Sequence, residues 1–292
     1  MCAAEGAPRR VPGPAGTRFA QVCWFGEIDS TNRWLADEAR DGAPEGTVAA
    51  AEFQRAGRGR LGRRWEAPAG SNLLVSVLLR PRYDAVTVHR CAAALALAAA
   101  DACAVVAGVH PGLKWPNDLV VGERKLAGLL AEVGPGPDPA LAEGRPCALV
   151  LGLGLNLRWP PPPGAEGPPG DAPPAPAGGD EGADDVMDRA TSLAREAGPG
   201  AAVPAPADVL AVLLGLVETR LAGLEGGGGA ALEAEVRRRC VTLGRPVRVV
   251  GAARTLEGRA LDITPGGELV LEVDGVAVTV AAGDVVHLRH AG

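Results

Sequence analysis

The feature of this sequence that most constrains its fold is a segment rich in proline and glycine at residues 158–185. It holds nine prolines and six glycines in 28 residues and begins with four consecutive prolines from Pro160. Proline interrupts helices and central strands, and such a segment cannot bury enough apolar surface to offset the entropy of ordering it. We therefore predict a disordered insertion here, and a proline-rich motif that binds another protein is the alternative.

The composition differs on the two sides of this segment. All nine aromatic residues lie at or before Trp159, and both lysines of the chain, Lys114 and Lys125, also precede it. This change in composition predicts a boundary between two structural regions near Trp159. With 292 residues, the chain is long enough to form a substantial core.

Charge and cysteine content narrow the class of protein. The net charge of −6 argues against a nucleic-acid-binding protein, which is usually basic. The six cysteines form no CxxC pair and no Cys/His ligand spacing, so the sequence predicts neither a zinc site nor a disulfide framework. The most apolar stretch, residues 91–108, contains Asp101 and predicts a buried helix instead of a membrane span. No apolar segment follows Arg9 and Arg10, so no secretory signal is predicted, and we expect a cytoplasmic protein.

Apolar periodicity and turn residues predict a mixed α/β region followed by a β region. Helices are predicted at residues 32–40, 88–107, 207–224 and 230–240, and strands at residues 48–53, 72–79, 119–121, 126–133 and 148–157. Five short strands are predicted at residues 247–250, 255–263, 268–273, 276–280 and 285–288, with a hairpin signal at Asp274-Gly275. We therefore expect a disordered tail over residues 1–17, an α/β (α+β) catalytic domain over residues 18–228 and a β-barrel of SH3-like size over residues 240–290.

An arginine-rich loop is the first motif that suggests chemistry. Five arginines lie between residues 55 and 64 with no acid among them, and Gly57, Gly59 and Gly62 leave the backbone free to turn. This pattern favours a loop that binds phosphate or carboxylate. A solvated basic turn is the alternative, and a nucleic-acid-binding arm is a third that the net charge disfavours. The G-x-G-x-x-G match at residues 57–62 does not predict a dinucleotide fold, because no apolar-periodic helix follows it.

The second motif contains both lysines. Lys114-Trp115-Pro116-Asn117-Asp118 is followed by Lys125-Leu126-Ala127-Gly128, in a chain that has no other lysine. A lysine charge suits a phosphate or a developing oxyanion, and a carboxylate such as that of Asp118 can bind a metal or accept a proton. An ordinary turn before a hairpin is the alternative, but the scarcity of lysine favours a functional site.

Two shorter motifs complete the candidate site. Asp29-Ser30-Thr31-Asn32 predicts a helix N-cap, whose exposed amides and hydroxyls can also bind polar ligand groups. Gly152-Leu153-Gly154-Leu155-Asn156 predicts a strand that a ligand approaches closely, and a tightly packed core strand is the alternative.

In their order and spacing, these motifs resemble those of biotin protein ligases, also called biotin–[acetyl-CoA-carboxylase] ligases. The resemblance covers about residues 18–290, apart from the insertion. It implies a catalytic domain similar to class II aminoacyl-tRNA synthetases and a C-terminal SH3-like barrel. Because only about 17 residues precede the catalytic region, we expect the short form of the family, without a DNA-binding domain and without transcriptional repressor activity.

The resemblance also implies a two-step reaction. The carboxylate of biotin attacks the α-phosphate of ATP to form biotinyl-5′-AMP and pyrophosphate. A lysine of a biotin carboxyl carrier protein or domain then attacks the mixed anhydride and releases AMP. The implied partner is this carrier, with no nucleic acid and no membrane, and the ligase is expected to be a monomer or a homodimer.

Each matched residue acquires a role from the resemblance. Lys125, Arg58 and Asp118 are the implied catalytic residues, and Asp118 would help to deprotonate the incoming lysine. The residues implied to bind biotin are Ser30, Thr31, Asn32, Gln54, Gly57, Arg58, Gly59, Arg60 and Lys125. Those implied to bind ATP are Arg58, Arg63, Trp65, Trp115, Asn117, Lys125 and Asn156. Mg²⁺ would arrive with ATP and keep several waters, so no residues are predicted to hold a metal.

Two other functions compete with this interpretation. A lipoate protein ligase shares the fold and the adenylate chemistry, but the arginine-rich loop and the motif at residues 114–118 favour biotin. A non-catalytic module that binds carrier proteins would explain the barrel but not the placement of the lysines.

Overall fold

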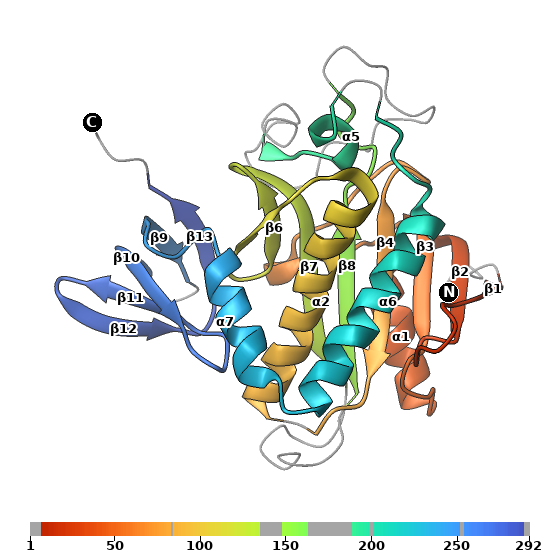
Figure 1. Cartoon of the computed structure of the whole chain (residues 1–292), viewed down its shortest axis with the longest axis horizontal. Helices are drawn as coiled ribbons and strands as arrows, with labels where there is room; N and C mark the ends of the chain where they lie inside the picture. The colour runs from red at the N-terminus through yellow and green to blue at the C-terminus, as the bar shows by residue number, and fades with distance from the viewer. Residues whose placement is uncertain are drawn as a thin grey trace.

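A computed structural model describes residues 7–82, 84–134, 148–162, 189–198, 201–251 and 254–288. An eight-stranded mixed sheet forms the larger part, in the strand order β1-β2-β3-β4-β8-β7-β6-β5, and a five-stranded antiparallel sheet in the order β12-β11-β10-β9-β13 forms the C-terminal part (Figure 1). The strands of the larger sheet are β1 (Arg9–Pro12), β2 (Gln21–Ile28), β3 (Val48–Gln54), β4 (Leu73–Leu79), β5 (Gly112–Lys114), β6 (Asp118–Val121), β7 (Arg124–Val133) and β8 (Leu149–Leu155). Those of the smaller sheet are β9 (Pro246–Val250), β10 (Thr255–Ile263), β11 (Leu269–Val273), β12 (Val276–Val280) and β13 (Asp284–His287).

Helices cover both faces of the larger sheet. Helix α1 (Thr31–Arg40) lies on one face, and α2 (Ala85–Ala107) and α6 (Pro206–Glu225) pack together on the other, with α7 (Gly229–Arg239) beside α2 (Figure 1). Successive residues of β3 therefore enter different cores: Val48 and Ala50 face α2 and α6, whereas Ala49 and Ala51 face α1. Because both faces are buried, β4 and β8 consist almost entirely of apolar residues and glycine, and Ser76 is the one polar residue in them. A 3₁₀ turn at Arg60–Gly62 and a short helix α5 (Leu193–Glu196) complete the described elements.

Helix α2 begins and ends at residues that suit helix termini. The carboxylate of Asp84 accepts a hydrogen bond from the backbone N–H of Thr87 at 2.8 Å, and Gly108 ends the helix in the left-handed conformation with φ 65°. Among the described residues, α2 is the one helix that is long and apolar enough to cross a membrane. However, 56% of its most apolar window is buried inside the molecule, as in the core helix of a globular domain.

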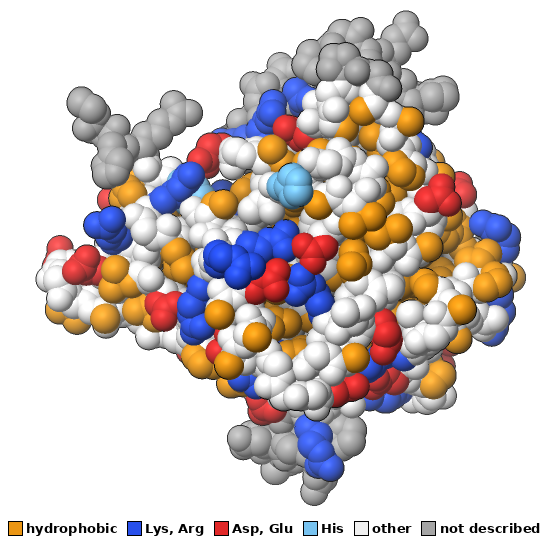
Figure 2. Space-filling view, in the orientation of Figure 1, with side chains coloured by type: hydrophobic (Ala, Val, Ile, Leu, Met, Phe, Trp, Pro, Cys, Tyr) orange, Lys and Arg blue, Asp and Glu red, His pale blue; other side chains and the backbone are white. Residues whose placement is uncertain are grey.

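Charged side chains join the three helices on this side of the molecule. Basic and acidic groups lie together on the surface near the end of α7 (Figure 2). Arg239 of α7 donates to Asp101 of α2 at 2.6 Å, and Arg220 of α6 donates to Glu235 of α7 at 3.1 Å and to Asp101. This network holds α7, and with it the start of the C-terminal domain, against the catalytic domain.

The expected combination of an α/β catalytic domain and a C-terminal β domain is confirmed. The prediction of a disordered tail over residues 1–17 is corrected at residues 9–12, because Arg9–Pro12 forms β1 and pairs with β2 in antiparallel fashion, and for residues 1–6 it lies outside the described residues. Apolar periodicity did not predict this edge strand, because backbone hydrogen bonds to β2 define it and only Val11 packs against the core. Strands β2 and β5 were also not predicted, and β5 is too short to show periodicity.

The predicted insertion is only partly within the described residues. Residues 158–162 are described, and Arg158 donates a hydrogen bond to the carbonyl of Val203 at 2.8 Å, so this end of the segment packs on the domain. The expectation of disorder for residues 163–185 lies outside the described residues.

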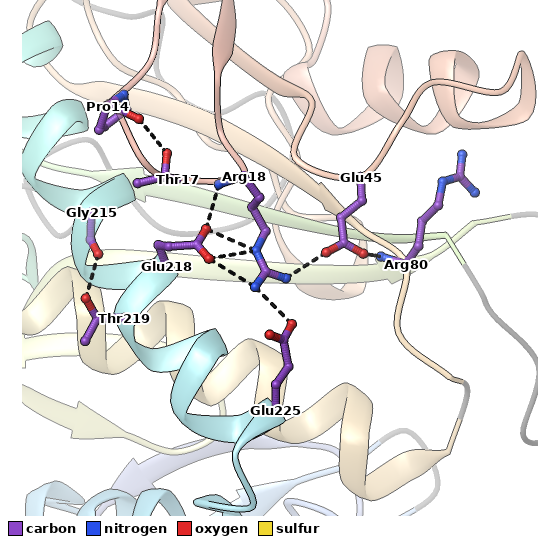
Figure 3. A network of polar contacts seen from close by, with 9 residues as sticks. All are labelled: Pro14, Thr17, Arg18, Glu45, Arg80, Gly215, Glu218, Thr219 and Glu225. Carbon is purple, nitrogen blue, oxygen red and sulfur yellow. Dashed lines mark hydrogen bonds and ion pairs between the residues drawn. The ribbon is translucent and has the colours of Figure 1, made fainter.

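Arg18 connects three parts of the catalytic domain (Figure 3). Its guanidinium lies 2.7 Å from Glu45, 3.0 Å from Glu218 and 2.9 Å from Glu225, and its backbone N–H donates to Glu218 at 2.8 Å. Glu45 lies between α1 and β3, whereas Glu218 and Glu225 belong to α6. Burial alone would raise the pKa of Glu218, but the hydrogen bonds and charge of Arg18 outweigh it and hold this pKa below its ordinary value.

We expect Arg18→Ala to reduce the free energy of unfolding at pH 7 by about 1–3 kcal/mol, because three carboxylates lose their common partner. The lowered pKa of Glu218 means that its stabilising contribution is present at neutral pH and is lost as the pH falls below about 4.3, the ordinary value for glutamate. The difference between wild type and variant should therefore shrink toward pH 3. Urea unfolding followed by circular dichroism at both pH values measures this, with the edge-strand variant Arg10→Ala as a control that should change little at either pH.

Candidate active site

A cavity lies over the larger sheet between the N-terminus of α1 and the arginine-rich loop. Strand β3 delivers Gln54 to it, β4 delivers Ser76, β7 delivers Lys125 and β8 delivers Gly152 and Gly154. The cavity is lined by Ser30, Thr31, Asn32, Gln54, Arg58, Gly59, Arg60, Arg63, Arg64, Trp65, Val75, Ser76, Asn117, Lys125, Gly128, Leu129, Leu130, Gly152, Leu153 and Gly154. A chain of neutral polar groups, an apolar wall and a cluster of cations thus meet at one place.

The neutral groups form a continuous hydrogen-bonded floor. Both the backbone N–H and the hydroxyl of Thr31 contact the Gln54 side-chain oxygen, at 2.8 and 3.1 Å. The Thr31 hydroxyl also lies 2.7 Å from that of Ser76, which donates to the Asn32 side-chain oxygen. Thr31, Asn32 and Ser76 are at most 4% exposed, so these hydrogen bonds satisfy groups that water does not reach.

Glycines in β8 make room for two side chains of the site. A Cβ atom at residue 152 would lie 2.2 Å from the Asn32 side-chain oxygen, and one at residue 154 would lie 2.4 Å from the Trp65 ring. Asn32 and Trp65 therefore pack directly on the backbone of this strand. The glycine spacing that predicted a close approach in β8 is explained by the protein's own side chains.

The arginine-rich loop folds back on itself over the cavity. The backbone N–H of Trp65 donates to the Gly57 carbonyl at 3.0 Å, and that of Gly59 donates to the Arg63 carbonyl at 2.7 Å. At the tip, Leu61 adopts a left-handed conformation with φ 57° and is 67% exposed. The loop therefore has a closed base and a strained, solvent-facing tip.

The arginines of the loop have different partners. Arg58 pairs with Glu132 of β7 at 2.9 Å, whereas Arg63 pairs with Asp284 of the C-terminal domain at 2.6 Å. Within the described part of the chain, the side chain of Arg60 donates one long hydrogen bond of 3.4 Å, to the carbonyl of Gly283. Burial lowers the pKa of Arg60, and no carboxylate within the described residues forms an ion pair with it. Arg60 is therefore a cation without an ion-pair partner among the described residues, and the charges of Asp284 and Asp118 offset the effect of burial on its pKa only in part.

Lys125 lies beside Asp118 and Trp65. Its ammonium is 2.7 Å from the Asp118 carboxylate and 5.5 Å from the centroid of a Trp65 ring. A bulge between β6 and β7 places Val120 opposite Lys125, although Leu119 still pairs with Ala127. The lysine is 37% exposed and lines the cavity, so its charge is available to an anionic ligand.

Most of the residues predicted for the site meet at the cavity. Those that line it are Ser30, Thr31, Asn32, Gln54, Arg58, Gly59, Arg60, Arg63, Trp65, Asn117 and Lys125. Trp115 and Asp118 line a neighbouring groove that also borders Arg58, Gly59, Arg60 and Asn117. Gly57 lies behind the lining, where a Cβ atom would be 2.3 Å from the Trp65 carbonyl oxygen.

The predicted role of Asn156 in binding ATP is revised. Its side-chain oxygen accepts from Asn72 at 2.9 Å, its amide donates to the Thr191 carbonyl at 2.9 Å, and it lines neither the cavity nor the groove. We assign it a structural role. Trp115 also connects elements, because its indole N–H donates to Gly267 of the C-terminal domain at 2.8 Å.

Ser76 and Glu132 belong to the site but were not predicted. Ser76 is the single polar residue of β4, whose seven residues are all buried, and a buried hydroxyl requires a partner; this signal could have identified it. Glu132 is partly exposed near the end of β7, and nothing in the sequence distinguishes it from a surface carboxylate.

Comparison with known proteins shows which protein family has this fold and these motifs. The model of the biotin/lipoate A/B protein ligase family matches residues 24–142, and that of the biotin protein ligase C terminal domain matches residues 242–288. The first match spans the arginine-rich loop and both lysines, and the second spans β9–β13.

The chain is also similar to individual proteins over nearly its whole length. It is 35% identical over 281 residues to the biotin–[acetyl-CoA-carboxylase] ligase of Mycobacterium tuberculosis, which covers 94% of this chain and 92% of that protein. It is 27% identical to the bifunctional ligase/repressor BirA of Bacillus subtilis, over 88% of this chain and 71% of that protein. The chain belongs to the biotin–[acetyl-CoA-carboxylase] ligase family and is a ligase, as its motifs predicted.

A solved structure confirms the fold. The chain is similar to the biotin protein ligase from Aquifex aeolicus in complex with biotin and ATP, with a TM-score of 0.71 over 92% of this chain and 98% of that one. The two sequences are 23% identical, so this similarity concerns the fold alone.

Proposed function

We propose that this protein activates biotin with ATP to form biotinyl-5′-AMP and then transfers biotin to a lysine of a biotin carboxyl carrier protein or domain. The observation that carries the proposal is the cavity itself, where a neutral polar floor, an apolar wall and a cluster of cations adjoin. The similar proteins and structures, whose names include biotin, ATP and acetyl-CoA carboxylase, support the choice of substrates. The Bacillus subtilis relative is named a bifunctional ligase/repressor, but we do not propose transcriptional repression for this protein.

The floor suits the head group of biotin. Its ureido ring is neutral and carries both hydrogen-bond donors and an acceptor, which matches the hydroxyls of Ser30, Thr31 and Ser76 and the amide of Gln54. Val75, Leu153 and Trp65 supply the apolar surface for the rest of the molecule. Because a polar site rejects analogues that leave its groups unpaired, this floor favours biotin over lipoate, whose dithiolane ring forms no such hydrogen bonds.

The cations that line the cavity suit the reacting end of biotin, which is its carboxylate. When the biotin carboxylate attacks the α-phosphate, negative charge develops on the phosphoryl oxygens, and Lys125 and Arg60 stabilise it. Asp118 borders the groove from which the acceptor lysine would enter and accepts its proton. The described residues contain no group of three or more His, Cys, Asp or Glu side chains that could hold a metal. Mg²⁺ would enter with ATP as part of the substrate, because it binds the phosphates of ATP and keeps several of its waters.

The direct test is ATP-dependent transfer of labelled biotin to a carrier domain, with a carrier whose acceptor lysine is replaced by arginine as the control. We expect label only on the unmodified carrier and biotin-dependent exchange between ATP and pyrophosphate. Parallel assays with lipoate should show little turnover. Exclusive use of lipoate, or no exchange by well-folded protein, would overturn the proposal.

We expect Gly154→Ala to reduce the rate of ATP–pyrophosphate exchange by about tenfold, because the new methyl group would overlap the Trp65 ring and displace it into the cavity. The matched control is Gly223→Ala in α6, where an added Cβ atom meets nothing within 4 Å. This control should retain full exchange activity and be slightly more stable. Equal exchange rates in the two variants would show that the position of Trp65 is not important for adenylate formation.

A further inference from the structure

Glu132 is the one carboxylate that contacts both the floor of the cavity and the loop above it, within the described part of the chain. One of its oxygens lies 2.9 Å from the guanidinium of Arg58. The other accepts a hydrogen bond of 2.9 Å from the side-chain amide of Asn32.

The contact on the floor side is held firmly. Asn32 is 4% exposed, its amide also donates to the Leu130 carbonyl, and its oxygen accepts from Ser76. The backbone of Gly152 closes the space behind it. One end of the Glu132 carboxylate is therefore fixed by a buried group, so less side-chain entropy is lost when the other end pairs with Arg58.

The strand pairing explains why the loop can reach Glu132. Strand β6 pairs with β7 only from Arg124 to Gly128, whereas β8 pairs with β7 as far as Val133. Residues 129–133 of β7 therefore have a neighbouring strand on one side only. Residues 129–133 of β7 and residues 58–62 of the loop line the same groove, and Arg58 contacts Glu132 there.

A connected path of polar contacts results. It leads from Gln54 through Thr31, Ser76 and Asn32 to Glu132, and from there to Arg58. The ligand proposed above would touch the first members of this path, and Arg58 belongs to the loop that covers the ligand. A ligand that contacts Gln54, Thr31 or Ser76 would therefore touch the same hydrogen-bonded path that holds the partner of Arg58.

We infer that Glu132 is a positioning residue that couples occupation of the cavity floor to closure of the arginine-rich loop by holding Arg58 over the cavity. This inference rests on the proposed function for the identity of the ligand, which is biotin. The ion pair between Arg58 and Glu132 can itself be tested without any substrate.

The first experiment measures trypsin cleavage within residues 58–64, identified by mass spectrometry of the intact chain. In ligand-free protein, we expect Glu132→Gln to be cleaved there about three- to tenfold faster than wild type. Biotin should slow this cleavage in wild type, but should protect Glu132→Gln much less even at concentrations that saturate binding. The matched control is Glu66→Gln, which removes the same charge from the ion pair with Arg64 at 3.2 Å but has no contact with the floor. It should retain protection by biotin.

The second experiment is a double-mutant cycle on the escape of biotinyl-AMP, measured as ATP-dependent biotinylation of an added bystander protein. Glu132→Gln and Arg58→Gln should each increase escape several-fold, and the double variant should leak no more than the worse single variant. In the control cycle of Glu132→Gln with Arg64→Gln, the effects should add.

The outcomes separate this inference from the proposed function. Equal cleavage of ligand-free wild type and Glu132→Gln, or additive effects of Glu132→Gln and Arg58→Gln, would overturn the positioning role. Full protection of Glu132→Gln by saturating biotin would overturn the coupling to the floor. If wild type forms no biotinyl-AMP, the proposed function fails, and the cleavage of ligand-free protein still tests the contact between Glu132 and Arg58.

Discussion

Lys125→Ala is expected to reduce the formation of biotinyl-AMP by about 10²–10³-fold while leaving the fold intact. The ammonium of Lys125 lines the cavity beside the apolar wall formed by Trp65, so it can meet the charge that develops during attack on the α-phosphate. The side chain is 37% exposed and fills no part of the core, so its removal should have little effect on folding.

Biotin-dependent ATP–pyrophosphate exchange measures this effect, and thermal unfolding followed by circular dichroism checks the fold. Lys125→Arg should recover part of the activity, because it keeps the charge but replaces a compact ammonium with a planar group. The matched control is Arg124→Ala, which removes the preceding cation; Arg124 lines neither cavity nor groove and pairs with Glu196. An exchange rate near that of wild type for Lys125→Ala would refute the assigned role.

Arg60→Gln should have the second large effect, a decrease of about 10²-fold in kcat/KM for ATP together with increased escape of biotinyl-AMP. Arg60 borders both the cavity and the groove, burial lowers its pKa by desolvation, and no carboxylate among the described residues forms an ion pair with it. An anionic substrate supplies that partner, so binding gains more from this arginine than from one that is already paired.

Arg58→Gln provides the comparison for this prediction. Arg58 is 54% exposed and already pairs with Glu132, so we expect its removal to change kcat/KM for ATP less than that of Arg60 and to act mainly on escape of the adenylate. The initial velocity at varied ATP and saturating biotin measures the first quantity, and biotinylation of a bystander protein measures the second. A larger loss of kcat/KM in Arg58→Gln than in Arg60→Gln would contradict this ranking.

Local signals predicted most of the secondary structure correctly. Ser30 caps α1 with a hydrogen bond from the backbone N–H of Arg33, and the turn at Asp274-Gly275 joins β11 to β12 as predicted. Helix α6 and the strands of the C-terminal domain begin and end within two residues of their predicted limits. These elements were predictable because their caps, turns and apolar periodicity act over a few neighbouring residues.

The strands that the sequence did not predict depend on pairing with other strands and not on their own local sequence pattern. Strand β1 exists because β2 offers an unpaired edge, and β5 exists because β6 lies beside it. The same applies to side chains. Asn156 stands directly after a glycine-spaced strand, and only the position of Asn72 and Thr191 determines that it faces the interior of the domain and does not line the cavity.

The sequence by itself determined which chemical groups this protein has for its site. In a chain with two lysines, four asparagines and two glutamines, it indicated Lys125, the arginine-rich loop, Asn32 and Gln54. Only the tertiary structure decided how these groups are paired: Arg58 with Glu132, Lys125 with Asp118, and Arg60 with no carboxylate among the described residues. The physical reason is that a motif specifies residue types through local geometry. The charge that each residue presents to a ligand depends on burial and on partners brought close by the pairing of distant strands.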